Sequence, residues 1–131
     1  MAPPMLSDRD GLHDRQEEPA ALTVAAGADR APGAPTWRGI SVAEAIEDYR
    51  LCCLAQAVDE REATFHKQGA AYFHVSGAGH EALLVGLARS LRAGYDWFFP
   101  YYRDLAFVLA LGVTPYDVLL QSVGAASDPA S

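Results

Sequence analysis

The chain has 131 residues and a formal net charge of −7, with 17 Asp and Glu against 10 Lys and Arg. It has no block of Lys or Arg that could neutralise a row of phosphates, which argues against nucleic acid as a partner. No apolar run approaches the roughly 20 residues that span a bilayer, and no export or import signal is visible at the N-terminus. We therefore expect a cytoplasmic protein that binds neither nucleic acid nor membrane.

Residues 1–36 combine Ala, Gly, Pro and charged residues without a sustained apolar period. Such a segment buries too little apolar surface to offset the entropy lost when it is ordered. We predict a flexible, disordered tail over residues 1–36 and a folded region over residues 37–131. The folded region is of marginal size for an independent hydrophobic core.

The first predicted helix runs from Val42 to about Gln68. Ser41 and Glu44 form a capping-box pattern at its start, and Gly69 supplies the stop. Residues at three-and-four spacing predict its buried face: Val42, Ala45, Ile46, Tyr49, Cys53, Leu54, Ala57, Val58, Arg61 and Phe65. The predicted outer face, which would meet solvent or another subunit, carries Glu47, Asp48, Arg50, Asp59, Glu60 and Glu62.

The only two cysteines, Cys52 and Cys53, are adjacent on this predicted helix. Successive side chains on a helix point about 100° apart, so the two thiols cannot easily join each other in a disulfide. No further ligands stand nearby at the spacing of a metal site. We interpret both as small buried hydrophobic residues.

A short extended segment and a second helix follow. Residues 71–75 have the composition of a strand, and they lead into a glycine turn over residues 76–79. Residues 81–91 then follow a helical period, which stops near Gly94. The side of this helix predicted to be buried carries Leu84, Leu87, Ala88 and Leu91.

The last part of the chain is predicted to hold an aromatic turn and two helices. Pro100 indicates an extended or turn conformation over residues 96–102. A helix follows over residues 104–111 and stops at Gly112. Thr114, with a proline behind it, is a good N-cap for a last helix that continues through Gln121.

Residues 77–82, Gly-Ala-Gly-His-Glu-Ala, fit the loose dinucleotide-binding fingerprint, with Asp96 near the place of a ribose ligand. A dinucleotide unit needs a robust strand before the turn and a second strand that carries the acid, and neither is predicted. We interpret the glycines as a tight turn into a helix. The free amides at this helix start could still face a phosphate or a substrate carboxylate.

The histidines offer little chemistry on their own. His80 and Glu81 occupy the first turn of the second helix, where Glu81 complements the helix dipole and His80 either hydrogen-bonds the loop or acts in catalysis. His66 and His74 have no evident carboxylate or nucleophile beside them. No residue is assigned as catalytic.

A run of aromatic residues ends in Arg103 and Asp104. An arginine at the edge of an apolar pocket can grip phosphate oxygens through two parallel hydrogen bonds, and a neighbouring tyrosine hydroxyl can add another. The alternative pairs Arg103 with Asp104 or with a distant acid at the surface, and leaves the rings as packing. These residues alone do not decide between the two interpretations.

Several stretches in order share the pattern of one family. They are residues 49–61, residues 76–82, residues 96–104, Ala-Leu-Gly-Val at 110–113 and Asp-Pro at 128–129. Together they resemble the alpha subunit of the branched-chain 2-oxo acid dehydrogenases, which depend on thiamine diphosphate. The resemblance implies an α/β thiamine-diphosphate-binding fold. Residues 37–131 would be its incomplete N-terminal portion, and this portion would be mainly α-helical.

The resemblance also implies a function in branched-chain amino acid catabolism. This is oxidative decarboxylation of a 2-oxo acid, with transfer of the acyl group to a lipoyl group on a partner acyltransferase, by a heterotetramer with beta subunits. Tyr101, Tyr102 and Arg103 match positions that bind the diphosphate of the cofactor. Phe73 and Tyr102 match positions that contact the substrate. The protein would place the cofactor and supply electrostatics, since the chemistry belongs to thiamine diphosphate.

The chain departs from the family pattern in two respects. Leu105 and Ala106 stand where the family usually has His-Gly or a similar small pair. The Gly-Asp-Gly motif that binds magnesium, its matching Asn and the active-site histidines have no counterpart here, so no metal ligand is assigned. We expect the chain alone to be inactive, as a fragment, a truncated product or one piece of a split subunit. The alternative is a non-catalytic helical interaction module.

Overall fold

Two short strands and four helices are described in the computed structural model, which covers residues 36–129. The mainly helical character predicted for this part of the chain is confirmed. The predicted tail lies outside the described residues except for Thr36, which belongs to a strand instead. None of the helices described is long and apolar enough to cross a membrane.

A tight hairpin precedes the first helix and was not predicted from the sequence. Strand β1, Thr36–Trp37, pairs antiparallel with β2, Ile40–Ser41. The two connecting residues, Arg38 and Gly39, have φ angles of 50° and 88°. Two successive positive φ values are typical of the type I′ turn, whose twist matches that of the flanking strands. The hairpin ends at Ser41, where the first helix begins.

Helix α1, Val42–Lys67, begins and ends as predicted, within one residue. The Ser41 hydroxyl accepts from the Glu44 amide at 3.2 Å, and the Glu44 carboxylate accepts from the Ser41 amide at 2.7 Å. This reciprocal pair satisfies two of the amides that a helix start leaves open. Gly69 follows the helix with a φ of 73°, a conformation that costs glycine little.

The predicted buried face of α1 is wrong over most of its length. The buried residues are Leu51, Ala55 and Val58, whereas Val42, Ile46 and Tyr49 are exposed. The cause is the continuous apolar run over residues 51–55, which surrounds the helix and gives no unique period. The face that becomes buried is the one that the later helices cover.

The predicted outer face of α1 is also corrected, because half of its residues contact other elements. Asp48 pairs with Arg89, and the Glu62 carboxylate accepts a hydrogen bond from the Ser122 hydroxyl. Asp59 bonds to the glycine turn. The other three side chains make no contact with another element among those described, and two of them, Glu47 and Arg50, form a surface ion pair with each other.

The remaining helices are α2, Glu81–Arg89, α3, Leu105–Ala110, and α4, Pro115–Ser122. Each lies at its predicted place and differs from the prediction by one or two residues at an end. Thr114 caps α4 as predicted, and its hydroxyl accepts from the Asp117 amide at 3.1 Å. The extended segment predicted over residues 71–75 forms neither a helix nor a paired strand in the described part of the chain, so its strand-like composition does not lead to a sheet.

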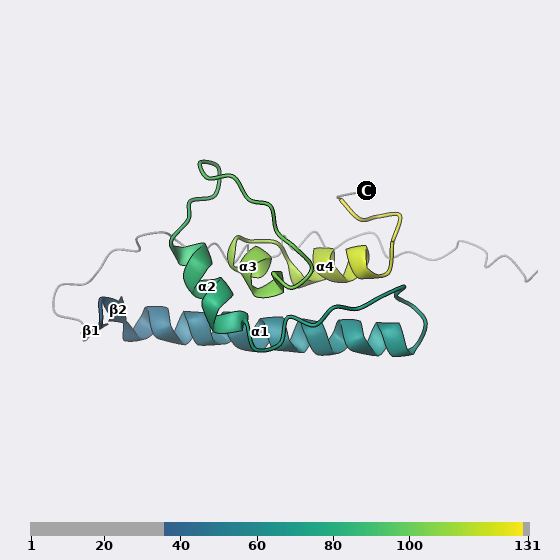
Figure 1. Ribbon diagram of the computed structural model, residues 1–131, viewed down its shortest axis with the longest axis horizontal. Helices are drawn as coiled ribbons and strands as arrows, with labels where there is room; N and C mark the ends of the chain where they lie inside the picture. Colours follow the sequence, from purple (N-terminus) through teal and green to yellow (C-terminus); the bar gives the residue numbers. More distant parts are fainter. Residues whose placement is uncertain (1–35, 130–131) are drawn as a thin grey trace, which may run out of the picture.

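The core lies where α1, α2 and α3 meet. In Figure 1, α2, α3 and α4 all lie along the same side of the long helix α1. The buried cluster is formed by Leu51, Ala55, Val58, Leu84, Val85, Ala88, Leu105, Ala106, Phe107, Leu109 and Ala110. Helix α4 contributes no buried residue and packs against the edge of this cluster. Leu87, predicted to be buried, is exposed, while its neighbours Val85 and Ala88 are buried.

Two connections shape the rest of the molecule. The segment between α1 and α2 turns back and runs alongside α1, so that the glycine turn meets the middle of that helix (Figure 1). The segment between α2 and α3 arches away from the helices. We call residues 90–104 the aromatic arch, since they carry most of the aromatic rings that are exposed among the described residues, Tyr95 included.

Candidate functional site

The carboxylate of Asp59 is the centre of a hydrogen-bond network on α1. Its Oδ1 accepts from the Gly77 amide at 3.1 Å and lies 3.3 Å from Nε2 of His74. Its Oδ2 accepts from the Ser76 hydroxyl at 2.8 Å. All of these side chains are partly buried. Three contacts to one carboxylate tie the glycine turn to the middle of α1, and hydrogen bonds to an ionised acceptor are stronger than neutral ones.

Three amides of the glycine turn are bonded to the protein's own oxygens and are not free for an external anion. The Ala78 amide donates to the Ser76 hydroxyl at 3.1 Å, and the Gly79 amide donates to the Glu81 carboxylate at 2.9 Å. With the Gly77 amide held by Asp59, the protein's own oxygens satisfy the donors that precede α2. Glu81 is the one buried charged side chain among the residues described.

The dinucleotide interpretation of the turn fails for the reason expected from the sequence. Within the described residues no strand leads directly into the turn, because β1 and β2 both lie before α1. The Asp96 carboxylate accepts from the Arg92 amide at 2.6 Å, so it closes the turn after α2 rather than offering itself to a ribose. The glycines therefore serve as the tight turn into α2.

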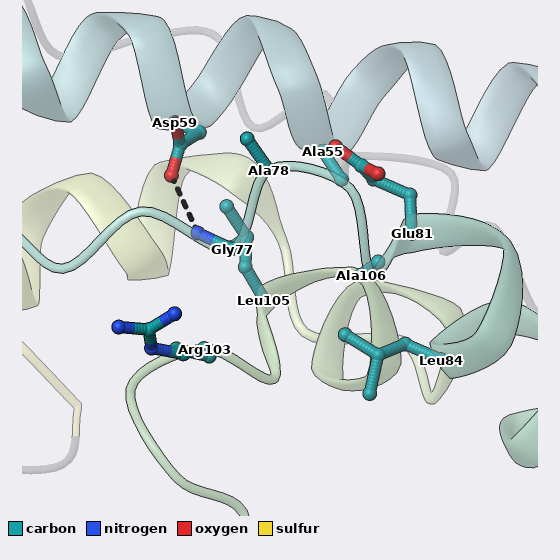
Figure 2. Close-up of a pocket in the computed structure, with 9 residues that line it drawn as sticks. All are labelled: Ala55, Asp59, Gly77, Ala78, Glu81, Leu84, Arg103, Leu105 and Ala106. Atoms are coloured by element: carbon teal, nitrogen blue, oxygen red, sulfur yellow. Dashed lines mark hydrogen bonds between the residues drawn. The ribbon is translucent and has the colours of Figure 1, made fainter.

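Gly77 touches the backbone of the aromatic arch. A Cβ atom built on Gly77 would lie 2.8 Å from the carbonyl oxygen of Arg103, a distance at which backbone must shift. Only glycine therefore fits at this position without displacing one of the two segments. Figure 2 shows Gly77 between Asp59 on α1 and Arg103 at the end of the arch.

The three aromatic residues predicted as site residues lie together. The rings of Phe73 and Tyr102 meet edge to face with centroids 5.1 Å apart, and those of Tyr101 and Tyr102 do so at 4.9 Å. All three are exposed. Edge-to-face pairs of this kind are favourable beyond the area they bury. The structure thus joins residues from two segments that are far apart in sequence, while their binding roles stay predictions.

Arg103 does not pair with Asp104, so one form of the alternative interpretation is wrong. The Asp104 carboxylate accepts from the Tyr101 amide at 2.8 Å and so closes the turn that leads into α3. Within residues 36–129, no carboxylate lies at ion-pairing distance from the Arg103 guanidinium. This exposed cation is therefore available to an anion from outside the described residues.

A small cavity lies between α1, the glycine turn and the start of α3. It encloses about 190 Å³, including space open to solvent. Its lining, drawn in Figure 2, is formed by Ala55, Asp59, Gly77, Ala78, Glu81, Leu84, Arg103, Leu105 and Ala106. The hollow has room for about one water molecule, so by itself it does not hold a cofactor or a substrate. Leu105 and Ala106, which depart from the family pattern, lie in this lining.

The histidines differ from the sequence interpretation at one position. His74 does have a carboxylate beside it, Asp59, which the sequence did not indicate. His66 Nδ1 lies 3.3 Å from the Ala71 carbonyl oxygen, where it closes the end of α1. His80 is exposed and its side chain makes no capping bond to α2. No nucleophile faces it in the contacts described, so His80 keeps no support for a catalytic role.

One group of potential metal ligands occurs in the described part of the chain. Asp59, Glu62 and His74 place one donor atom each within 4.8 Å of one another. Both carboxylates are already engaged, by the glycine turn and by Ser122. The group is therefore explained as a hydrogen-bond network, and no metal ligand is assigned to it.

The two cysteines are free, and only part of the sequence interpretation holds. Cys52 is partly buried, whereas Cys53 is exposed. Burial, with Glu81 and Asp48 nearby, raises the pKa of the Cys52 thiol above its ordinary value. A raised pKa keeps the thiol protonated and makes it a poor nucleophile or metal ligand.

Asp59, Ser76 and Gly77 are site residues that the sequence analysis did not assign. Ser76 and Gly77 lie 17 and 18 residues after Asp59 in the sequence, so no local spacing indicates that they meet. The available signal was the Asp-Glu-Arg stretch at residues 59–61, which belongs to the family pattern. The sequence pattern instead places Asp59 on the outer face of the helix, among other charged residues.

Comparison with known proteins shows the family to which the chain belongs. Residues 49–131 match the Dehydrogenase E1 component family. This match covers more than half of the chain, and the protein therefore belongs to that family. No solved structure matches the chain at a significant level.

Two curated relatives illustrate the similarity. The 2-oxoisovalerate dehydrogenase subunit alpha of Bacillus subtilis is 39% identical over 93 residues, 71% of this chain and 28% of the relative. The 3-methyl-2-oxobutanoate dehydrogenase subunit alpha of Mycobacterium tuberculosis, in each of two strains, is 33% identical over 67 residues, 51% of this chain and 18% of the relative. The chain thus spans less than a third of the length of these relatives.

Proposed function

We propose that residues 37–131 are the N-terminal part of the thiamine-diphosphate-binding α/β domain of a 2-oxo acid dehydrogenase component. The proposed substrates are branched-chain 2-oxo acids, with a beta subunit and a lipoyl-bearing acyltransferase as partners. Support comes from the family match and from the names of the relatives in Bacillus and Mycobacterium. The cytoplasmic location stays a prediction.

The observation that carries the proposal is the unpaired guanidinium of Arg103 beside two tyrosines. Its planar fork suits the oxygens of a diphosphate, and Tyr101 and Tyr102, which directly precede it in the chain, carry hydroxyl groups that can add hydrogen bonds. We infer that these three residues hold the diphosphate of the cofactor. When bound, thiamine diphosphate supplies the electron sink for decarboxylation. The magnesium ion expected with it has no assigned ligand among these residues.

Phe73 and Tyr102 are proposed to contact the substrate. Their edge-to-face packing gives a stiff apolar wall next to the proposed diphosphate contacts. Such a wall favours an apolar acyl side chain over a charged one, because burial of an unpaired charge is costly. This agrees with the branched-chain substrates that the names of the relatives indicate.

The test is the affinity of thiamine diphosphate for the component assembled from the full-length subunit that contains these residues and its beta partner. Arg103→Ala is expected to weaken binding by about 1.5 to 3 kcal/mol, roughly ten- to a hundredfold in Kd, because a charged hydrogen-bond donor is lost. Titration calorimetry in the presence of magnesium measures this. Arg50→Ala is the matched control, since Arg50 pairs only with Glu47 on the exposed side of α1. Unchanged affinity in Arg103→Ala would contradict the assignment.

A second candidate function is a non-catalytic interaction module. The observation that favours it is the aromatic arch, in which Trp97 and Phe99 are 88% and 89% exposed. Contiguous exposed apolar surface marks sites of protein association. A compact, non-aggregating monomer in light scattering and hydrogen exchange, without affinity for thiamine diphosphate, would favour this module over the enzyme component.

A further inference from the structure

We propose that Asp59 is a positioning residue that fixes the Ser76–Gly77 turn against the backbone of Arg103. Through that contact it sets where Arg103 and Tyr102 lie relative to Phe73. The inference rests on the proposed function, because the residues that are positioned are the proposed cofactor and substrate contacts. Asp59 itself does not reach those groups and acts only through the turn.

The first step is the strength of the anchor on α1. One oxygen of the Asp59 carboxylate accepts from the Gly77 amide and the other accepts from the Ser76 hydroxyl. These two hydrogen bonds together fix the orientation of the carboxylate plane. His74 adds a third contact from the same segment. Asp59 follows the buried Val58 on a long, well-packed helix, which makes it a rigid point of attachment.

The second step is the tight contact between the turn and Arg103. Gly77 is buried, and the Arg103 carbonyl oxygen occupies the place that a Cβ atom would take in any other residue. Close-packed protein interiors transmit displacement of this kind rather than absorb it. A shift of the turn toward or away from α1 therefore changes the position of the Arg103 peptide.

The third step concerns the two walls of the proposed site. Phe73 lies three residues before Ser76 on the anchored segment, and Tyr102 lies directly before Arg103. Their rings meet at 5.1 Å, so the two segments touch at a second point. Anchoring by Asp59 thus sets the relation between the proposed acyl wall and the proposed diphosphate contacts.

The experiment compares Asp59→Asn with Glu60→Gln in the assembled component. Glu60 is the exposed neighbour on α1, and the same change of charge there removes no contact to the turn. Asp59→Asn is expected to raise the KM for thiamine diphosphate about tenfold, the scale of one charged hydrogen bond, with kcat at saturating cofactor nearly unchanged. Glu60→Gln should leave both unchanged. A loss of kcat without a change in KM would indicate a merely structural role and overturn the proposal.

A second measurement separates this inference from the proposed function. Hydrogen exchange of the amides over residues 101–104 is expected to speed up in Asp59→Asn, whether or not a cofactor binds. Unchanged exchange there would overturn the positioning role. If instead exchange rises while Arg103→Ala leaves cofactor affinity intact, the positioning role stands and the cofactor assignment fails.

Two further variants keep the test decisive if Asp59→Asn folds poorly. Ser76→Ala removes one of the contacts to Asp59 and is expected to act in the same direction with a smaller rise in KM. Gly77→Ala forces a shift against Arg103 and should raise KM as well. Because Asp59 and Gly77 act through one contact, the double variant should show less than the product of the two single effects. Independent, fully multiplicative effects would contradict the mechanism.

Discussion

Helix α3 and the aromatic arch are consecutive in the chain, and both are rich in apolar residues, yet their environments are opposite. Phe107 on α3 is 5% exposed, whereas Phe99 on the arch is 89% exposed. The difference does not come from residue type. It comes from position, because α1 and α2 cover α3 while no described element covers the arch.

This contrast shows which part of the chain holds the fold and which part is left for other contacts. The core residues of α3 remove apolar surface from water and stabilise the folded state. The exposed rings of the arch contribute little to that core. Phe98 is the exception, since its ring packs edge to face on Phe107 with centroids 5.6 Å apart and ties the arch to the core.

The largest expected effect comes from truncating the buried ring. Phe107→Ala should lower the free energy of unfolding by about 3 to 5 kcal/mol, because it removes apolar contacts and leaves a cavity. Phe99→Ala, the same change eight residues earlier in the exposed arch, should stay within about 0.5 kcal/mol. Urea denaturation followed by circular dichroism measures both. Equal losses would show that the arch is packed and would break the contrast.

A smaller loss of unfolding free energy is expected when a partly buried ion pair is compared with an exposed one. The side chains of Arg89 and Asp48 are each 24% exposed and join α2 to α1, and Arg89 also donates to the Glu44 carbonyl oxygen. Arg89→Ala should therefore lower the free energy of unfolding by about 1 to 2 kcal/mol. Arg50→Ala, at an exposed pair on α1, should change it by less than about 0.5 kcal/mol.

Urea denaturation at low and at high salt measures these two losses. The Arg50 effect should fade with salt and the Arg89 effect should persist, because partly buried pairs are screened less. A smaller loss of unfolding free energy in Arg89→Ala than in Arg50→Ala would show that α1 and α2 are joined by their apolar faces alone.

The smallest expected effect is on thiol chemistry. Because burial raises the pKa of Cys52, less of it is thiolate at a given pH, and a Cys53→Ser variant should react with iodoacetamide more slowly than glutathione does at pH 8. Its rate should rise as the pH is raised further. The neutral thiol favours the folded state, so this contribution to stability is present at low pH and is lost as the pH rises through the folded pKa.

Mass spectrometry of the alkylated protein measures the rate, with the urea-unfolded variant as control. Unfolding should remove the difference from glutathione. A fast reaction of folded Cys52 would show that the α1 surface near Glu81 and Asp48 is open to solvent.

The helices could be predicted because their ends depend on neighbouring residues. The capping boxes at Ser41 and Thr114 and the stop at Gly69 are local chemistry that a single sequence displays. The buried face of α1 could not be predicted, since apolar residues surround it over residues 51–55 and only the later helices select one side. The strand-like composition of residues 71–75 could not show whether the extended segment would join a sheet, because pairing also needs a second strand, and none pairs with it among the described residues.

The candidate site was predictable only in part. Tyr101, Tyr102 and Arg103 are adjacent in sequence, so a planar cation beside aromatic rings was visible at once. Only the family resemblance assigned Phe73 and Tyr102 to one substrate site, and the contact between their rings is seen only in the structure. The Asp59 network was missed, because its contacts join residues 15 to 18 positions apart and depend on how the chain turns back along α1.

The aromatic arch connects α2 to α3 along the chain but lies outside the core in which these two helices meet. The buried faces of α2 and α3 pack against each other directly, so we expect these contacts to hold the two helices together without the covalent link over residues 90–104. Exposed connections of this kind are where proteolytic nicking and inserted segments are tolerated. Cleavage within the arch, before Phe98, would therefore divide the polypeptide into two pieces that remain associated. The contact between Gly77 and Arg103 would then be a contact between two separate chains.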